Sequence, residues 1–155
     1  MPTSRSLDSE EEGDLDRYLL MGLELVPIPA GVEDLDRQDP ALLVLGIGTL
    51  VDAVRSGLTL PDGLGVEEMS TSLGVLLGEE LCRCVGWSWV YLTFEDGFEG
   101  LAVADSQGGL AMLPIHYIFG LLTQPDVDNS LGMLFQMIRD GQTPEVSAGD
   151  WRILG

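Results

Sequence analysis

The feature that most limits how this chain can fold is a large acidic excess combined with a large apolar fraction. Its 155 residues include 26 Asp or Glu against 7 Arg and no Lys, a formal net charge of −19, yet 45% of them are hydrophobic. Disordered acidic segments are poor in apolar residues, so we expect a folded body with a negative surface. Such a surface repels nucleic acid and anionic membranes and attracts basic proteins.

Length, hydropathy and cysteine usage further limit the classes of protein to which the chain can belong. The length fits one domain, no run of about 18 apolar residues would cross a membrane, and the acidic start does not look like a signal peptide. Cys82 and Cys84 fall in a predicted helix and would point about 200° apart, so we expect free thiols. We therefore expect a cytoplasmic protein, and Arg without Lys suggests the codon usage of a high-GC bacterium.

The N-terminal quarter divides into two predicted segments before the domain begins. Residues 1–13 are acidic and lack apolar periodicity, which predicts disorder. Residues 14–38 are predicted as a short helix over 14–25 and an extended connector, because Pro27 and Pro29 stop the helix. Asp39-Pro40 is a typical helix start and opens a predicted single α+β domain over 39–155.

The domain is predicted to begin with two helices and to continue with strands. Apolar residues recur every three or four positions over 40–56 and 66–85, which predicts helices. Gly74 and Gly78, four apart, predict a close approach by another backbone, and we expect the Gly46–Gly48 stretch of the first helix there. Segments 87–94, 101–104 and 110–113 predict strands, and 115–122 and 131–139 predict helices. The predicted fold class is α+β, with helices flanking a small three-stranded antiparallel meander.

Few residues of the sequence suggest catalysis or the binding of a metal or cofactor. His116 is the only histidine and could serve in acid–base catalysis, but without partner residues we expect a structural role. Glu80 shares a helical face with leucines, so we expect a buried carboxylate paired with Arg83 or His116. No spacing of His, Cys, Asp or Glu matches a metal site, and no cofactor motif occurs. The sequence therefore predicts no catalytic residues, no metal and no cofactor.

A protein-binding surface is the stronger candidate. Aromatic side chains dominate binding hot spots, and three of them alternate along one predicted strand face beside an acidic turn. We predict that this aromatic face and this turn contact a basic protein. The predicted contact residues are Trp87, Trp89, Tyr91, Glu95, Asp96 and Glu99.

The stretches Leu73-Gly-Val-Leu-Leu-Gly-Glu-Glu80, Gly86-Trp-Ser-Trp-Val90, Glu95-Asp-Gly-Phe98 and Leu113-Pro114 resemble an uncharacterised bacterial family of small α+β proteins. The resemblance covers about residues 73–122, and its motifs are structural. By analogy, small acidic proteins of this type resemble the immunity partners of bacterial toxins.

Three functions remain open from the sequence. The first is a cytoplasmic acidic module that neutralises or holds a basic partner, such as a toxin domain. The second is a secretion-chaperone-like dimer that binds an effector segment, which we rank lower because only three strands are predicted. The third is an enzyme using Glu80 and His116, which a single His and a single buried Glu do not support. The sequence does not determine the oligomeric state.

Overall fold

The computed structural model describes residues 2–26, 40–60 and 63–155, and these residues form five helices and five strands. In chain order the elements are β1 (Thr3–Ser6), α1 (Ser9–Leu25), α2 (Pro40–Arg55), α3 (Val66–Val85), β2 (Ser88–Thr93), β3 (Glu99–Ala104), β4 (Leu110–Met112), α4 (Pro114–Thr123), α5 (Leu131–Arg139) and β5 (Arg152–Leu154).

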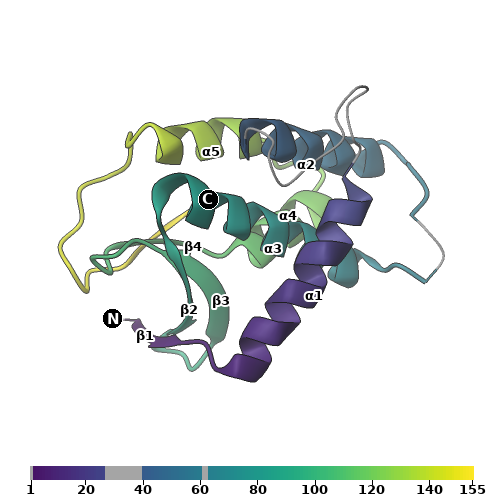
Figure 1. The fold of residues 1–155 in the computed structure, drawn as a ribbon. Helices are drawn as coiled ribbons and strands as arrows, with labels where there is room; N and C mark the ends of the chain where they lie inside the picture. The colour runs from purple at the N-terminus through teal and green to yellow at the C-terminus, as the bar shows by residue number, and fades with distance from the viewer. Residues whose placement is uncertain (1, 27–39, 61–62) are drawn as a thin grey trace.

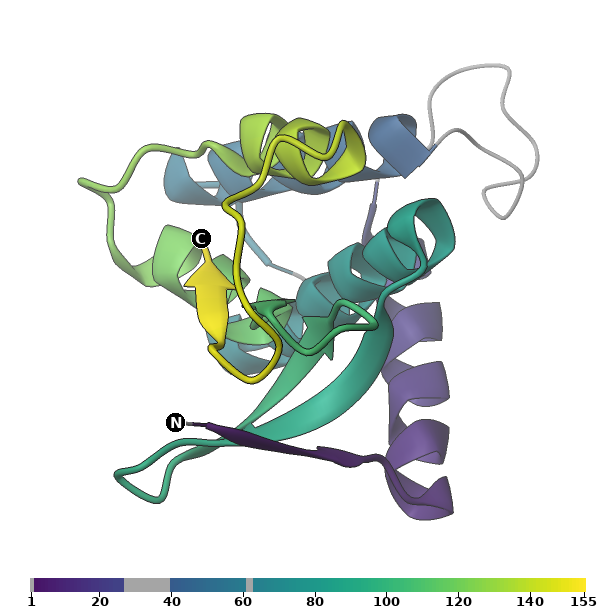
Figure 2. The same ribbon diagram turned by 90° about the vertical axis from the view of Figure 1, so that its left-hand side faces the viewer.

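The helices are arranged in layers above one face of the sheet (Figure 1). α3 and α4 pack against each other and against β3, and α2 and α5 form a second helical layer farther from the sheet. α1 runs along one side and packs against α3, while β1 lies at the sheet edge (Figure 2). The α+β class predicted from the sequence is confirmed.

The sheet corrects the predicted topology. It has five strands in the order β1-β2-β3-β4-β5, with antiparallel pairs from β1 to β4 and a parallel β4–β5 pair. The prediction of a three-stranded antiparallel meander was therefore wrong. The two missed strands lie at the sheet edges and expose nearly all their side chains, so backbone pairing rather than apolar alternation defines them.

The N-terminus is more regular than its composition suggests. β1 occupies residues 3–6, and α1 begins at Ser9 rather than near residue 14, within the segment predicted as disordered. Asp8 caps the helix, since its Oδ1 accepts from the Glu11 amide at 2.8 Å, while Glu11 Oε1 accepts from the Asp8 amide at 2.9 Å. This reciprocal capping box stabilises the first turn. The predicted connector and the Asp39 cap fall almost entirely outside the described residues.

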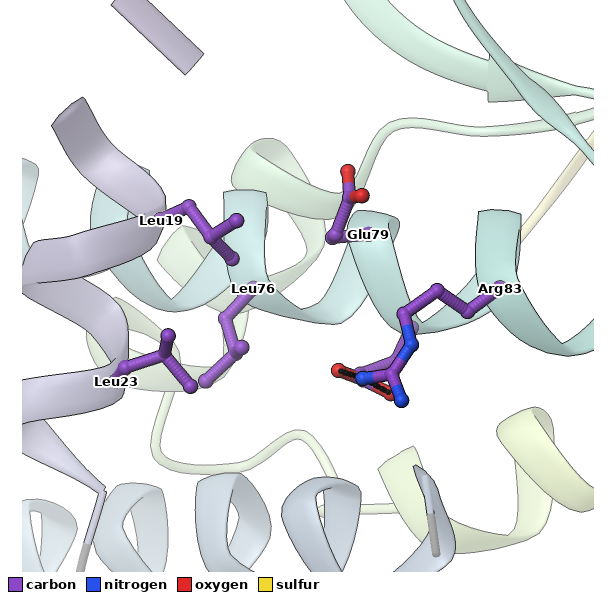
Figure 3. A pocket seen from close by; sticks show the side chains of 6 residues that line it. Leu19, Leu23, Leu76, Glu79 and Arg83 are labelled. Carbon is purple, nitrogen blue, oxygen red and sulfur yellow. Dashed lines mark hydrogen bonds and ion pairs between the residues drawn. The ribbon is translucent and has the colours of Figure 1, made fainter. Parts of the chain in front are cut away.

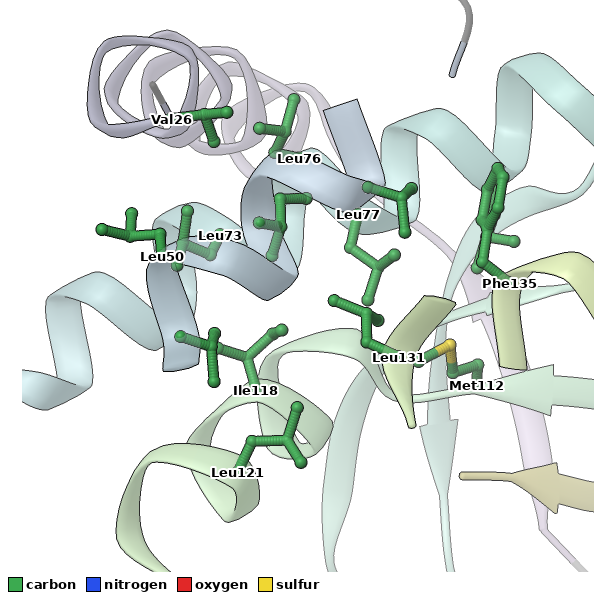
Figure 4. Packing of buried hydrophobic residues seen from close by; sticks show 14 of the residues in the cluster. Val26, Leu50, Leu73, Leu76, Leu77, Met112, Ile118, Leu121, Leu131 and Phe135 are labelled. Carbon is green, nitrogen blue, oxygen red and sulfur yellow. The ribbon is translucent and has the colours of Figure 1, made fainter. Parts of the chain in front are cut away.

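The main core lies where the helices meet (Figure 4). Leu73 and Leu77 of α3, Ile118 of α4 and Leu131 of α5 are each at most 1% exposed. Burying a side chain of this kind contributes roughly 1.5–3 kcal/mol. A smaller cluster, formed by Leu92, Ala102, Ala104 and Ala111, lies on the opposite face of the sheet, with Trp151 packed against it.

The two glycines of α3 do allow a close approach, but of a different element. A Cβ on Gly74 would lie 2.5 Å from Ile115 Cα, and a Cβ on Gly78 would overlap the Trp89 ring. The neighbours are therefore α4 and β2, and the predicted contact with the Gly46–Gly48 stretch of α2 was wrong. Gly86 then ends α3 in the left-handed conformation (φ 74°).

Candidate functional site

Two neighbouring hollows lie along the contact between α1 and α3. One has a volume of about 240 Å³ and the other about 400 Å³, and both are lined by Glu79. We refer to the two together as the α1–α3 groove. The smaller hollow is lined by Leu19, Leu23, Leu76, Glu79, Glu80 and Arg83 (Figure 3), and the larger by Ser6, Leu7, Glu12, Leu15, Glu79, Cys82, Trp87, Ser88 and Trp89.

The wall that α1 provides is apolar. Leu15, Leu19 and Leu23 are spaced four residues apart, so they form a row along one side of the helix with about 6 Å between successive residues. All three are half-buried. Leu19 and Leu23 also pack against the main core. All three leucines line the groove, which gives the groove a continuous hydrocarbon side.

The wall that α3 provides carries a buried ion pair. The Glu80 side chain is 2% exposed, and Arg83 Nη1 donates to its two carboxylate oxygens at 2.9 and 3.2 Å. The guanidinium side chain is 38% exposed and reaches the groove surface (Figure 3). Of the two partners that the sequence suggested for Glu80, the structure places Arg83 beside it, whereas His116 lies elsewhere.

Glu79 lies between the two hollows. Its Oε2 accepts a hydrogen bond of 3.2 Å from Trp89 Nε1, and the Trp89 ring lies against Gly78 of the same helix. Glu79 is half-buried, and Glu12 across the groove is exposed. Among the described residues, no Arg forms an ion pair with either carboxylate, so the groove holds two acids that α1 and α3 do not neutralise.

The structure separates the residues predicted to contact a partner. Trp87, Trp89 and Tyr91 are half-buried on the helix side of the sheet, and the first two line the groove. Glu95 and Asp96 are exposed in the turn after β2, and the six residues of β2, which span about 20 Å, separate this turn from Trp87. The aromatic residues at the start of β2 and the acidic turn at its end therefore do not form one surface.

Arg5 connects the remaining predicted residues. Its guanidinium donates to Glu11 at 2.8 and 3.0 Å and to Glu99 at 2.8 Å, and it lies over the Tyr91 ring at 4.4 Å. The hydrogen bonds from Arg5 and from the Asp8 amide lower the pKa of Glu11 to about 2. We call this arrangement the Arg5 clasp. It ties β1 to the start of α1 and to β3.

In the described part of the chain, the histidine and the two cysteines do not form a metal site. His116 is exposed on α4 and meets Phe98 edge-to-face, with the ring centroids 5.2 Å apart. Cys82 and Cys84 are free and half-buried, and burial, with a smaller effect of Glu79, raises the pKa of the Cys82 thiol to about 12. In the parts of the chain that the structure describes, no group of three or more potential ligands could hold a metal ion.

Comparisons of the chain with protein-family models, with curated proteins and with solved structures gave no match. The resemblance over residues 73–122 therefore stays a prediction. Over the ranges 2–26, 40–60 and 63–155, none of the helices combines the length and the hydropathy needed to cross a bilayer.

Sequence reasoning missed the groove although part of its signal is present. The spacing Leu15, Leu19, Leu23 and the pattern Asp8-x-x-Glu11 are both readable, and together they predict a longer α1 with a leucine row. The angle at which α1 crosses α3 is not readable, because it depends on the contact between Gly22 and Ser72. A Cβ on Gly22 would lie 2.5 Å from the Ser72 carbonyl oxygen, so only glycine permits this crossing.

Proposed function

We propose that this chain is a binding protein for a basic protein partner. The observation that carries the proposal is that four of its seven Arg side chains, all four in the described residues, bind groups of the chain itself. Arg5 and Arg83 bind carboxylates of the chain itself, and Arg17 pairs with Asp14 at 3.1 Å. Arg55 donates to two backbone carbonyl oxygens at 2.7 and 2.6 Å. These four Arg side chains therefore do not offset the negative charge of the other Asp and Glu side chains at the surface.

Much of this excess is concentrated on α1. Its exposed carboxylates belong to Glu10, Glu12, Asp14, Asp16 and Glu24. A surface of one sign attracts an oppositely charged protein over distances near the Debye length, about 8 Å at physiological salt, and speeds its association. Affinity then requires buried anchors, which the apolar wall and the half-buried Trp87 and Trp89 of the groove can provide.

A toxin domain held by an immunity protein would be a partner of this kind. We place the binding in the cytoplasm, because the two cysteines lie two apart on one helix as free thiols, which suits a reducing compartment.

A capture experiment tests this proposal. The full chain, immobilised through a terminal tag, is incubated with lysate of its own host at low and at high salt, and retained proteins are identified by mass spectrometry. We expect one basic protein at near-stoichiometric amount at low salt, and less of it at high salt. The control is a bait of similar net charge and unrelated fold, because non-specific cation capture would also occur on it. Equal capture by both baits, or none by either, would refute the proposal.

The number of strands in the sheet favours a second candidate function, the secretion chaperone. The secretion-chaperone alternative ranked lower because three strands were predicted, and the sheet has five. Such a chaperone acts as a dimer, so sedimentation equilibrium separates the two candidates. A stable dimer that binds an unfolded segment would favour the chaperone, and a monomer that binds a folded basic domain would favour the first proposal.

A further inference from the structure

We propose that the α1–α3 groove binds a basic amphipathic helix of the partner. The inference rests on the proposed function and names the place and form of the contact. It depends on three properties of the groove: an apolar row along one side, two carboxylates without an Arg partner among the described residues, and two long walls made by α1 and α3, with residues of β1 and β2 at one end.

The two long walls favour a helical occupant. The backbone groups of α1 and α3 are paired within each helix, so an extended segment would find no strand edge along these two helices and would leave its own backbone groups unpaired there. A helix satisfies its backbone internally and presents only side chains. Helix-in-groove recognition places apolar side chains at every third or fourth position against such a row.

The dimensions agree with this occupant. From Glu12 to Leu23 the groove follows α1 for eleven residue steps, about 16 Å at the helical rise, which equals about three turns of a bound helix. The leucine row would receive the apolar face of that helix. Trp87 and Trp89 close the end of the groove near β2, where they can pack on the hydrocarbon stems of Lys or Arg side chains or stack on Arg.

The two carboxylates of the groove determine that the bound helix is positively charged. Glu12 lies at one end of the groove and Glu79 near its middle, on opposite walls, while Glu80 is bound to Arg83. Lys or Arg beside the apolar face of the partner helix would therefore meet carboxylates on both sides. Charged groups that approach partly desolvated carboxylates fix the register of a complex and slow its dissociation.

The probe for the test is a fluorescein-labelled peptide of about 18 residues, made of Leu, Lys and Ala with Leu on one helical face. Its binding to the full chain is followed by fluorescence anisotropy. The variant is Glu12→Gln with Glu79→Gln, in which the side-chain carbonyl introduced at position 79 can still accept from Trp89. The matched control is Glu10→Gln with Glu24→Gln, since both acids are exposed on α1, outside the groove lining. Both double variants lose the same net charge.

We expect the groove variant to bind the peptide about tenfold more weakly than the unaltered chain, and the control variant to change affinity by less than about threefold. Leu19→Gln should also weaken binding, whereas Leu20→Gln, at a position 64% exposed and outside the groove, should not. Equal losses for both double variants, equal binding of a scrambled peptide of the same composition, or no binding by the unaltered chain would overturn the inference.

These outcomes are separable from the proposed function. If the groove variant still captures the basic protein from lysate with unchanged affinity, the partner binds elsewhere on the acidic surface and only the groove assignment fails. If the unaltered chain captures no basic protein, the proposed function itself fails.

Discussion

Replacing Gly74 with alanine tests the contact that positions α4 on α3. Gly74 is buried, and a Cβ there would lie 2.5 Å from Ile115 Cα and 2.7 Å from Ile115 N. Carbon atoms in ordinary contact are about 3.5–4.0 Å apart, so α4 would have to move by about 1 Å. The obstacle is backbone, which cannot turn aside as a flexible side chain can.

Two opposing effects determine the magnitude. Overpacking a tight interior costs roughly 1–3 kcal/mol, and the better helix propensity of alanine returns about 1 kcal/mol. Because α4 is held on its other sides by α2 and β3, we expect the upper part of the overpacking range. The free energy of unfolding should therefore fall by about 1–2 kcal/mol, which lowers Tm by roughly 4 °C for a chain of this size.

The assay is urea and thermal unfolding, followed by circular dichroism at 222 nm. The control is Gly13→Ala in α1, where no heavy atom lies within 4 Å of the added Cβ. Only helix propensity acts at that position, so the control should gain about 0.5–1 kcal/mol. If both variants gain stability to the same extent, α3 and α4 are not in the contact described, and the packing argument fails.

Three further predictions follow from the ion pairs and thiols. Arg5→Gln should move the NMR titration of Glu11 from about 2 up toward the ordinary carboxyl range, and an unmoved midpoint would contradict the Arg5 clasp. In the unaltered chain the clasp stabilises the fold above about pH 4.5, and this stabilisation is lost as the pH falls toward 2. Burial raises the pKa of the Cys82 thiol to about 12, so in the folded chain at pH 8 it should react with iodoacetamide far more slowly than in the chain unfolded by urea. Peptide mass spectrometry measures both rates, and equal rates would refute its burial. Arg83→Met should cost about 2–3 kcal/mol by removing the guanidinium that hydrogen-bonds the buried Glu80 carboxylate, less than for a fully buried pair because the guanidinium is partly exposed. Adding Glu80→Gln should recover part of this loss in urea unfolding, and no recovery would argue against the pair.

The helices could be predicted because their apolar faces repeat in the sequence. The periodicity over 66–85 matches α3, and the predicted helix over 115–122 matches α4, which begins at Pro114. The edge strands could not be predicted. Thr3–Ser6 has no apolar side chain, and three residues at 152–154 pair with β4 across more than thirty positions of chain. Backbone pairing of this kind leaves little trace in composition.

The candidate site was likewise predictable from the sequence only in part. The burial of Glu80 followed from its place among leucines on one helical face, and Arg83, one of the two partners that the sequence suggested, lies beside it. The groove required the crossing of α1 and α3, which depends on the Gly22–Ser72 contact between segments fifty residues apart. The predicted union of the aromatic strand with the acidic turn overlooked the length of β2, which separates them.

The most direct test of the account is the affinity for the captured partner as a function of salt. The partner is purified, and its Kd for the full chain is measured by calorimetry between about 50 and 500 mM NaCl. The account predicts a one-to-one complex whose affinity falls steadily as salt screens the acidic surface, with residual binding from apolar contacts at the highest salt. An affinity that does not change with salt, or a captured partner that is itself acidic, would contradict the claim that the negative surface of this chain recognises a basic protein.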